Sequence, residues 1–248
     1  MIDFEHIYKS YNEGETVVFS DFSLSIERGE FVVLTGVSGS GKSTLISMLL
    51  LDKRPDSGDI YVNERRLASM KGRDVPKYRQ SIGAIFQDFR LMPDETVYGN
   101  IEIARIISGA PQKNFSQRVY HVSKMLGITN LLKKHPDEIS GGEMQKVCIA
   151  RAIVNNPQIF IADEPTSNLD TGYSKEILKL LALINKQGIT LLIATQDPVI
   201  ASYEGARIVE LEKTETKTDI EGLCNYDDEK DWIHDVFPIK KTGGRLLF

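Results

Sequence analysis

The sequence has few cysteines, no long apolar run and no excess of positive charge. Only Cys148 and Cys224 occur in 248 residues, far apart and in no metal-like spacing, so we expect a reduced, cytoplasmic protein. The apolar stretches 45–51 and 189–194 are too short to cross a bilayer, and the early acids of the N-terminus argue against a signal peptide. The net charge of −5 argues against a broad nucleic-acid-binding surface. Any membrane role must therefore depend on a partner.

Short apolar segments alternate with helical patterns along most of the chain. Such short, apolar segments are typical of a mostly parallel sheet that is covered by helices on both faces. More polar segments around Phe4, 22–26 and 59–62 favour an antiparallel side sheet. The sequence therefore predicts an α/β fold whose buried strands lie at residues 31–35, 82–86, 159–162, 189–194 and 207–211.

Residues 88–155 have a mainly helical pattern. Residues 116–126 place Val119, Val122 and Leu126 on one helical face. We therefore predict one domain over residues 1–211, with a helical subdomain inserted at about 88–155. The composition then changes, because residues 212–231 hold eight acids and three lysines. Residues 212–248 are predicted to form an acidic linker and a tail, which could be poorly ordered or could dock on the domain or a partner.

A glycine-rich run between a predicted strand and a predicted helix matches a phosphate-binding loop. Its glycines let backbone N–H groups converge on phosphate oxygens, and the following helix directs its positive end at the same anion. Lys42 is expected to reach the β- and γ-phosphates, and the Ser43 hydroxyl to bind Mg²⁺. The predicted loop is Gly36-Val37-Ser38-Gly39-Ser40-Gly41-Lys42-Ser43, followed by Thr44.

Two acids follow the predicted strand at 159–162. In open α/β sheets, ligands bind at the carboxyl ends of the strands. We therefore expect Asp163 to hold the Mg²⁺ shell and Glu164 to act as general base on the attacking water. Further upstream, Ser140 and Glu143 predict a capping box at the start of a helix, and Gly141 and Gly142 leave backbone N–H groups open to an anion.

Together these motifs resemble the full set of the ABC ATPase family over roughly residues 1–211. The resemblance implies a parallel-sheet P-loop core with ATP and Mg²⁺ as ligands. It places Tyr11 against adenine, and Gln87 near Mg²⁺ and the attacking water. It also implies a homodimer on ATP binding, in which each ATP is covered by the partner copy's signature loop (Ser140, Gly141, Gly142 and Glu143), with Asp170 at the dimer seam.

Finer stretches resemble the cell-division branch of the family. The resemblance implies an integral membrane partner of FtsX type, membrane contact only through that partner, a place on the cytoplasmic face of the membrane, and no nucleic acid. Lipoprotein-release and efflux ATPases share much of this pattern and stay open as alternatives, as does a nucleotide-gated scaffold with little turnover. A DNA or ribosome factor is disfavoured by the single motif set and the absence of a heptad run. The finer matches are 74–76, 82–88, 96–100 and 155–157.

One position departs from the family pattern. The family has a histidine at the centre of a Thr-His-Asp triplet, whereas this chain has Thr195-Gln196-Asp197. The amide of Gln196 can donate to a phosphate but can carry neither a proton nor a positive charge. We therefore expect ATP binding and dimer closure to survive and hydrolysis to be slow, with adequate substitution by Gln196 as the alternative.

Overall fold

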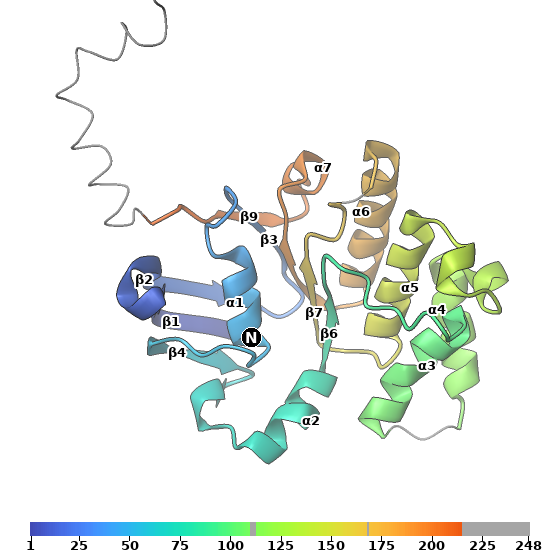
Figure 1. The fold of residues 1–248 in the computed structure, drawn as a ribbon, viewed down its shortest axis with the longest axis horizontal. Coiled ribbons are helices and arrows are strands. Elements are labelled where there is room, and N and C mark those ends of the chain that lie inside the picture. The colour runs from blue at the N-terminus through green and yellow to red at the C-terminus, as the bar shows by residue number, and fades with distance from the viewer. Residues whose placement is uncertain (110–112, 168, 215–248) are drawn as a thin grey trace, which may run out of the picture.

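The computed structural model describes residues 1–109, 113–167 and 169–214. These form two sheets with helices packed around them (Figure 1). The predicted tail falls almost wholly on residues 215–248, outside the described ranges. No helix in the described ranges is long and apolar enough to span a bilayer.

The first sheet is antiparallel and has the strand order β2-β1-β4-β5. Its strands alternate buried and more exposed residues, as expected for a sheet with one solvated face. Ile2 and Phe4 of β1 pair with Ile26 and Leu24 of β2, which places these apolar side chains on the buried face. The strands are β1 (Ile2–Tyr11), β2 (Thr16–Ile26), β4 (Ser57–Val62) and β5 (Arg65–Arg66).

The second sheet is parallel and has the order β6-β7-β8-β3-β9. Four of its strands are almost continuously buried, because helices or the antiparallel sheet cover both faces. The predicted α/β class, with a parallel core and an antiparallel side sheet, is confirmed. The strands are β3 (Phe31–Thr35), β6 (Ile82–Ile85), β7 (Ile159–Asp163), β8 (Thr190–Ala194) and β9 (Arg207–Glu210).

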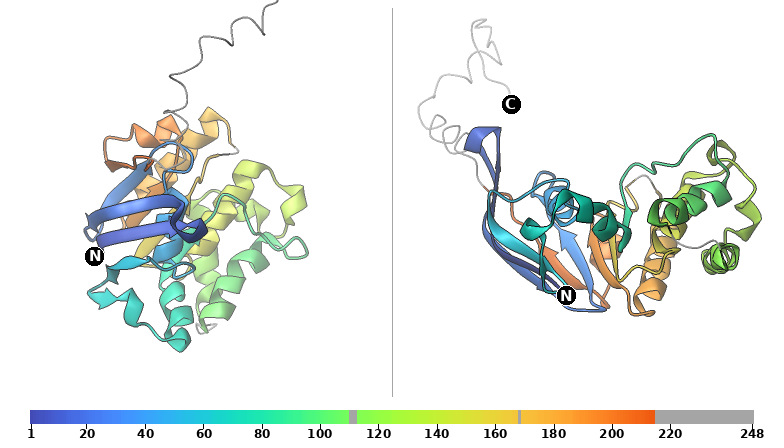
Figure 2. Two further views of the ribbon diagram at one scale, coloured as in Figure 1. Left: turned by 60° about the vertical axis from the view of Figure 1, so that its left-hand side comes forward. Right: turned by 90° about the horizontal axis from the view of Figure 1, so that it is seen from below.

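Successive residues of the parallel strands enter two separate cores. Val32, Leu34 and Ile161 pack with α1 and the antiparallel sheet, whereas Val33 and Phe160 pack with helices of the opposite face. Helices α3, α4 and α5 lie together, on the side of the molecule away from the antiparallel sheet (Figure 2). The α-helices are α1 (Lys42–Leu49), α2 (Val75–Gln80), α3 (Val97–Ser108), α4 (Phe115–Met125), α5 (Gly141–Ile153), α6 (Thr171–Asn185) and α7 (Pro198–Ala201). Short 3₁₀ helices are η1 (Asn12–Gly14), η2 (Leu67–Ser69), η3 (Gly72–Asp74), η4 (Thr129–Leu131) and η5 (Pro136–Glu138).

The register of the parallel sheet determines where the site forms. Ala194 pairs with Leu34 of β3 on one side and with Asp163 of β7 on the other, and Ala162 pairs with Ile85 of β6. These four strands therefore end side by side. The loops that follow them meet at one edge of the sheet, where open α/β folds bind ligands.

Candidate functional site

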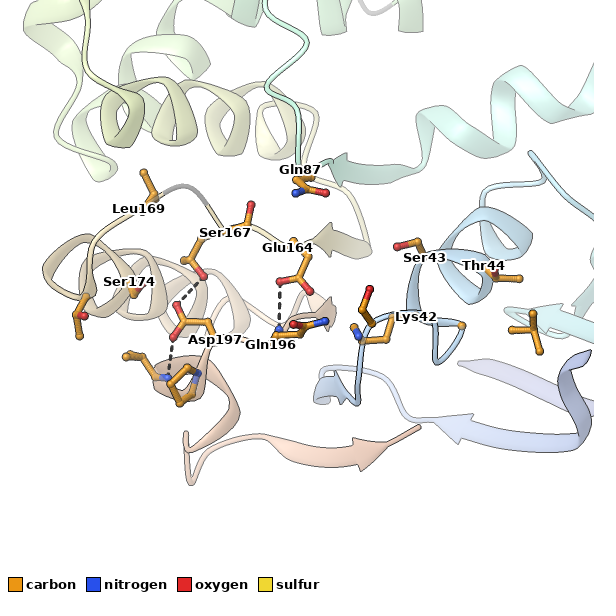
Figure 3. Close-up of a pocket in the computed structure, with 18 of the residues that line it drawn as sticks. Lys42, Ser43, Thr44, Gln87, Glu164, Ser167, Leu169, Ser174, Gln196 and Asp197 are labelled. Carbon is orange, nitrogen blue, oxygen red and sulfur yellow. Dashed lines mark hydrogen bonds between the residues drawn. The ribbon is translucent and has the colours of Figure 1, made fainter. Parts of the chain in front are cut away.

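The loops at this edge enclose a cleft of ≈ 820 Å³. Lys42, Ser43 and Thr44 lie on one side of the cleft, and Gln87, Glu164 and Gln196 lie on the other (Figure 3). The sheet thus brings together residues that are more than 150 positions apart in the sequence. The predicted site residues that line the cleft are Tyr11, Ser38, Gly39, Gly41, Lys42, Ser43, Thr44, Gln87, Glu164 and Gln196.

The phosphate loop is closed around its own lysine. The Lys42 ammonium donates to the carbonyl oxygens of Gly36 at 2.7 Å and Val37 at 3.1 Å, and its side chain is buried. Helix α1 begins at Lys42, with Gly41 in a left-handed conformation before it. Gly36 also has a positive φ, and a Cβ there would collide with the carbonyl oxygen of Leu211. A cationic side chain and a helix N-terminus therefore converge on the loop, as anion binding requires.

Asp163 ends β7 beside the phosphate loop. Burial raises the pKa of its carboxyl, and this effect is opposed by a hydrogen bond with the Ser43 hydroxyl and by the charge of Lys42. Its Oδ1 atom is buried and has no hydrogen-bond partner. Such an oxygen beside a hydroxyl fits a hard cation like Mg²⁺, which takes oxygen ligands and keeps several waters. Within the described ranges no cluster of three or more His, Cys, Asp or Glu side chains could hold a metal alone, so phosphate and water oxygens would complete the shell.

Glu164 follows directly and has a positive φ of 49°, which turns its side chain into the cleft. Its backbone N–H donates to the carbonyl of Ala194 at 2.8 Å. Its Oε2 atom accepts from the Thr195 hydroxyl at 3.2 Å and from the Gln196 backbone N–H at 3.1 Å. A strained backbone held by neighbouring strands is common where a side chain must point at a ligand.

Gln87 and Gln196 both present exposed side chains to the cleft. Gln87 lies in the loop after β6, and Gln196 in the loop after β8. The hydrogen bond from Gln196 to Glu164 uses the backbone, so it does not depend on which side chain stands at position 196.

Tyr11 ends β1 at the rim of the cleft. Its hydroxyl lies 3.1 Å from the Thr44 hydroxyl and accepts from the Lys53 ammonium at 2.9 Å. The ammonium groups of Lys53 and Lys9 also lie over the ring, 4.7 and 5.6 Å from its centroid. Burial alone would raise the pKa of Tyr11, but the hydrogen bonds and the two positive charges lower it. Neither lysine was predicted: Lys9 lies two residues before Tyr11 on the same strand, whereas Lys53 is 42 positions away in the sequence.

The signature loop forms the predicted capping box. The Glu143 N–H donates to the Ser140 hydroxyl at 3.3 Å, and the Ser140 backbone N–H donates to Glu143 at 2.8 Å. The Ser140 backbone N–H and the Ser140 hydroxyl both donate to the Glu143 carboxylate and so hold the pKa of Glu143 below its usual value. Gly142 is buried in the single chain, and a Cβ there would overlap the ring of Tyr173, so this ring packs directly against the glycine.

Several predicted ligand-binding residues do not line the cleft of the single chain. The Asp170 carboxylate instead caps α6, accepting from the backbone N–H groups of Gly172 at 2.8 Å and Tyr173 at 3.2 Å. Outside the cleft lining are Gly36, Val37, Ser40, Asp163, Ser140, Gly141, Gly142, Glu143 and Asp170. The first four lie in or directly beside the phosphate loop, whereas the last five lie on α5 and before α6.

A polar network around Asp197 also lines the cleft and was not predicted. Asp197 accepts from the Thr166 hydroxyl at 2.6 Å and from the Val199 N–H at 2.8 Å. Burial by itself would raise the pKa of Asp197. Hydrogen bonds from Ser174, Thr166 and the Val199 backbone outweigh this effect and lower the pKa below its usual value. The sequence signal is the Asp-Pro pair at 197–198, which is typical of a helix start.

The site combines a phosphate loop, a buried carboxylate beside that loop that fits a cation, and a second carboxylate in the cleft, which defines a P-loop nucleotide hydrolase. The family model described as ABC transporter matches residues 19–167, and the chain belongs to this family of ATPases. It is an ABC-type ATPase that binds ATP and hydrolyses it.

Within the family, the chain is similar to ATPases of the FtsE type. It is 44% identical over 211 residues to the cell division ATP-binding protein FtsE of Mycobacterium tuberculosis, covering 85% of this chain and 92% of that protein. It is 41% identical to FtsE of Escherichia coli, and the match covers 85% of this chain and 95% of that protein. A dimeric ATP-binding cassette, MJ0796, in a post-hydrolysis state bound to ADP and Pi has a TM-score of 0.78 at 32% identity, covering 88% and 97%. These likenesses make the chain an ABC ATPase subunit of FtsE type.

Proposed function

We propose that ATP binds in the cleft with its adenine against Tyr11 and its phosphates in the loop 36–44. Lys42 would exchange its carbonyl contacts at Gly36 and Val37 for phosphate oxygens, since a phosphate is the stronger partner for an ammonium. Ser43 and Asp163 would hold Mg²⁺, which supplies charge neutralisation at the phosphates. Glu164 would accept the proton of the attacking water, with Gln87 orienting that water.

We propose that two copies close head to tail around two ATP molecules. In the single chain the signature residues Ser140 to Glu143 and Asp170 stand outside the cleft, so this chain alone leaves the phosphates open to water. A second copy would bring its α5 N-terminus to the γ-phosphate, because a helix N-terminus stabilises an anion. The dimeric state of the similar MJ0796 cassette supports this arrangement. We assign the cassette to residues 1–211 and its helical subdomain to 88–155.

We propose that a partly apolar groove between the sheet core and the helices is the docking site for a membrane partner. It has a volume of ≈ 400 Å³, and Ile107 at its rim is 64% exposed. The groove is linked to the loop of Gln87, because Arg151 donates to the carbonyl oxygens of Phe89 at 2.9 Å and Arg90 at 2.7 Å. We call it the coupling groove, lined by Pro76, Arg79, Gln80, Ile82, Gly83, Ala84, Ile103, Ala104, Ile107, Arg151, Ala152 and Asn155.

The occupant that this groove fits is a short amphipathic helix from an integral membrane protein of FtsX type. Apolar residues of the groove, among them Ile103 and Ile107, would bury its apolar face. Movement at the groove would then reach Gln87 through Arg151. In this role the ATPase sits on the cytoplasmic face of the membrane, contacts the membrane only through the partner, and regulates peptidoglycan hydrolysis in cell division. The FtsE names of its relatives favour division over lipoprotein release or efflux.

Affinity purification of the full chain from native membranes tests this role. We expect an FtsX-type protein to co-purify, and Ile107→Asp to abolish its recovery. Leu183→Asp is the matched control, because Leu183 is also an exposed apolar residue (42%) but lies on α6 outside the groove. Recovery of an export permease would overturn the division role. Equal recovery with Ile107→Asp would overturn the groove as the docking site.

A further inference from the structure

Thr195 lies fully buried directly behind Glu164, and none of the proposed catalytic roles uses it. It follows the last residue of β8, and its backbone N–H donates to the carbonyl of Leu34 at 3.0 Å. This bond continues the pairing of β8 with β3 by one residue. The Thr195 backbone is therefore fixed to the sheet that also carries the phosphate loop.

The hydrogen-bond partners of the Thr195 hydroxyl determine where its proton points. Its oxygen accepts the backbone N–H of Asp197 at 3.0 Å, so a lone pair is already used. Among the described residues, its other hydrogen-bond neighbour is Oε2 of Glu164 at 3.2 Å, which as a carboxylate oxygen can only accept. The hydroxyl proton therefore points at Glu164.

The loop that carries Thr195 is held on its other side as well. Asp197 is bound by the Thr166 hydroxyl at 2.6 Å and by the Val199 N–H at 2.8 Å. Thr166 belongs to the loop after Glu164, so this bond closes a ring of contacts between the two loops. The ring leaves Thr195 little freedom to move away from the carboxylate.

Glu164 is thus anchored through one oxygen and open at the other. Oε2 receives two hydrogen bonds, from Thr195 and from the Gln196 backbone, whereas Oε1 receives none from any described residue. We infer that Thr195 is a positioning residue that fixes the Glu164 carboxylate so that Oε1 faces the attacking water. This inference rests on the proposed role of Glu164 as general base.

Substitutions of buried threonines on the same strand separate positioning from packing. Thr195→Val keeps the volume and removes the hydroxyl, and Thr195→Ser keeps the hydroxyl. Thr190→Val is the matched control, because Thr190 is equally buried at the other end of β8, where its hydroxyl accepts from Gly29. We expect Thr195→Val to lower kcat by roughly 10- to 100-fold, the loss typical of one hydrogen bond to a charged group. Thr195→Ser and Thr190→Val should stay within about 3-fold of wild type.

Two readouts separate positioning from a general loss of structure. Binding of a fluorescent ATP analogue should be unchanged within about 2-fold in Thr195→Val, because no proposed ATP contact is lost. A crystal structure of nucleotide-free Thr195→Val should show the Glu164 carboxylate away from the Gln196 N–H. Wild-type kcat in Thr195→Val, or an unmoved carboxylate, would overturn the inference.

The dependence on Glu164 can be tested separately. In a Glu164→Gln background, Thr195→Val should cause no further loss, since the group that it positions is already disabled. An equal further loss there would show that Thr195 acts on packing and would overturn the inference. Full turnover by Glu164→Gln alone would instead show that Glu164 is not the general base. That result would overturn the proposed role on which the inference rests, and it would not test the contact between Thr195 and Glu164.

Discussion

Replacing Gln196 by histidine is the substitution that most directly tests how this ATPase differs from the family pattern. The Gln196 side chain is exposed in the cleft, and the contact from this position to Glu164 uses the backbone N–H at 3.1 Å. Gln196→His therefore leaves the position of Glu164 intact. In the proposed binding mode, what changes is the group presented to the γ-phosphate, which becomes a side chain that can carry a proton and a positive charge.

The expected size of the effect follows from the loss of one electrostatic donor. A well-placed donor to developing charge is worth roughly 10²–10³ in rate at comparable sites. The amide of Gln196 retains part of this donor capacity, so we expect Gln196→His to raise kcat by at least about 10-fold. Affinity for ATP should change by less than about 3-fold, because the loop and Tyr11 are untouched.

Phosphate release at saturating Mg²⁺-ATP measures kcat, and a fluorescent ATP analogue measures affinity. Gln117→His on the exposed surface of α4 is the control for adding a histidine elsewhere. If Gln196→His leaves kcat unchanged, then Gln196 substitutes fully for the histidine, and the proposal of slow hydrolysis is wrong.

Three further changes test other parts of the molecule. Tyr11→Ala should weaken ATP binding by about 3- to 10-fold while Tyr11→Phe keeps most of the affinity, because stacking needs the ring and not the hydroxyl; titration of a fluorescent ATP analogue measures both. Ser140→Ala removes the cap of α5 and its contact with Glu143, so the free energy of unfolding in urea should fall by about 0.5–2 kcal/mol. Burial raises the pKa of Cys148 to about 11, so in a Cys224→Ser variant thiol labelling at pH 8 should be slow until denaturant is added, and rapid labelling of the folded protein would contradict its burial.

The architecture was predictable because its strands are short, apolar and separated by helical patterns. The predicted strands at 31–35, 82–86 and 159–162 agree with β3, β6 and β7 to within one residue. Chemistry-bearing residues at the ends of such strands must meet, since parallel strands place their carboxyl ends at one edge. The sequence alone therefore predicts that Lys42 and Glu164 lie in one site.

Contacts that depend on side-chain packing could not be predicted in the same way. Gly142 belongs to the signature motif, and the ring of Tyr173 packs against it in the single chain. The two residues lie on different helices, and neither periodicity nor local propensity specifies how α5 and α6 approach each other. The contact of Lys53 with Tyr11 is a similar case, because Lys53 comes from the loop after α1 and Tyr11 from the end of β1.

The geometry at position 196 explains why the site can keep its arrangement with glutamine there. The contact from this residue to Glu164 is a hydrogen bond donated by its backbone N–H. Any residue except proline has this N–H and can make the same bond. The side chains of the two neighbouring residues hold the loop in place. The Thr195 hydroxyl donates to Glu164 at 3.2 Å, and the Asp197 carboxylate accepts from the Thr166 hydroxyl at 2.6 Å. We therefore expect a substitution at 196 to change only the group that we propose meets the γ-phosphate, so that turnover varies while the positions of Glu164 and the phosphate loop are preserved.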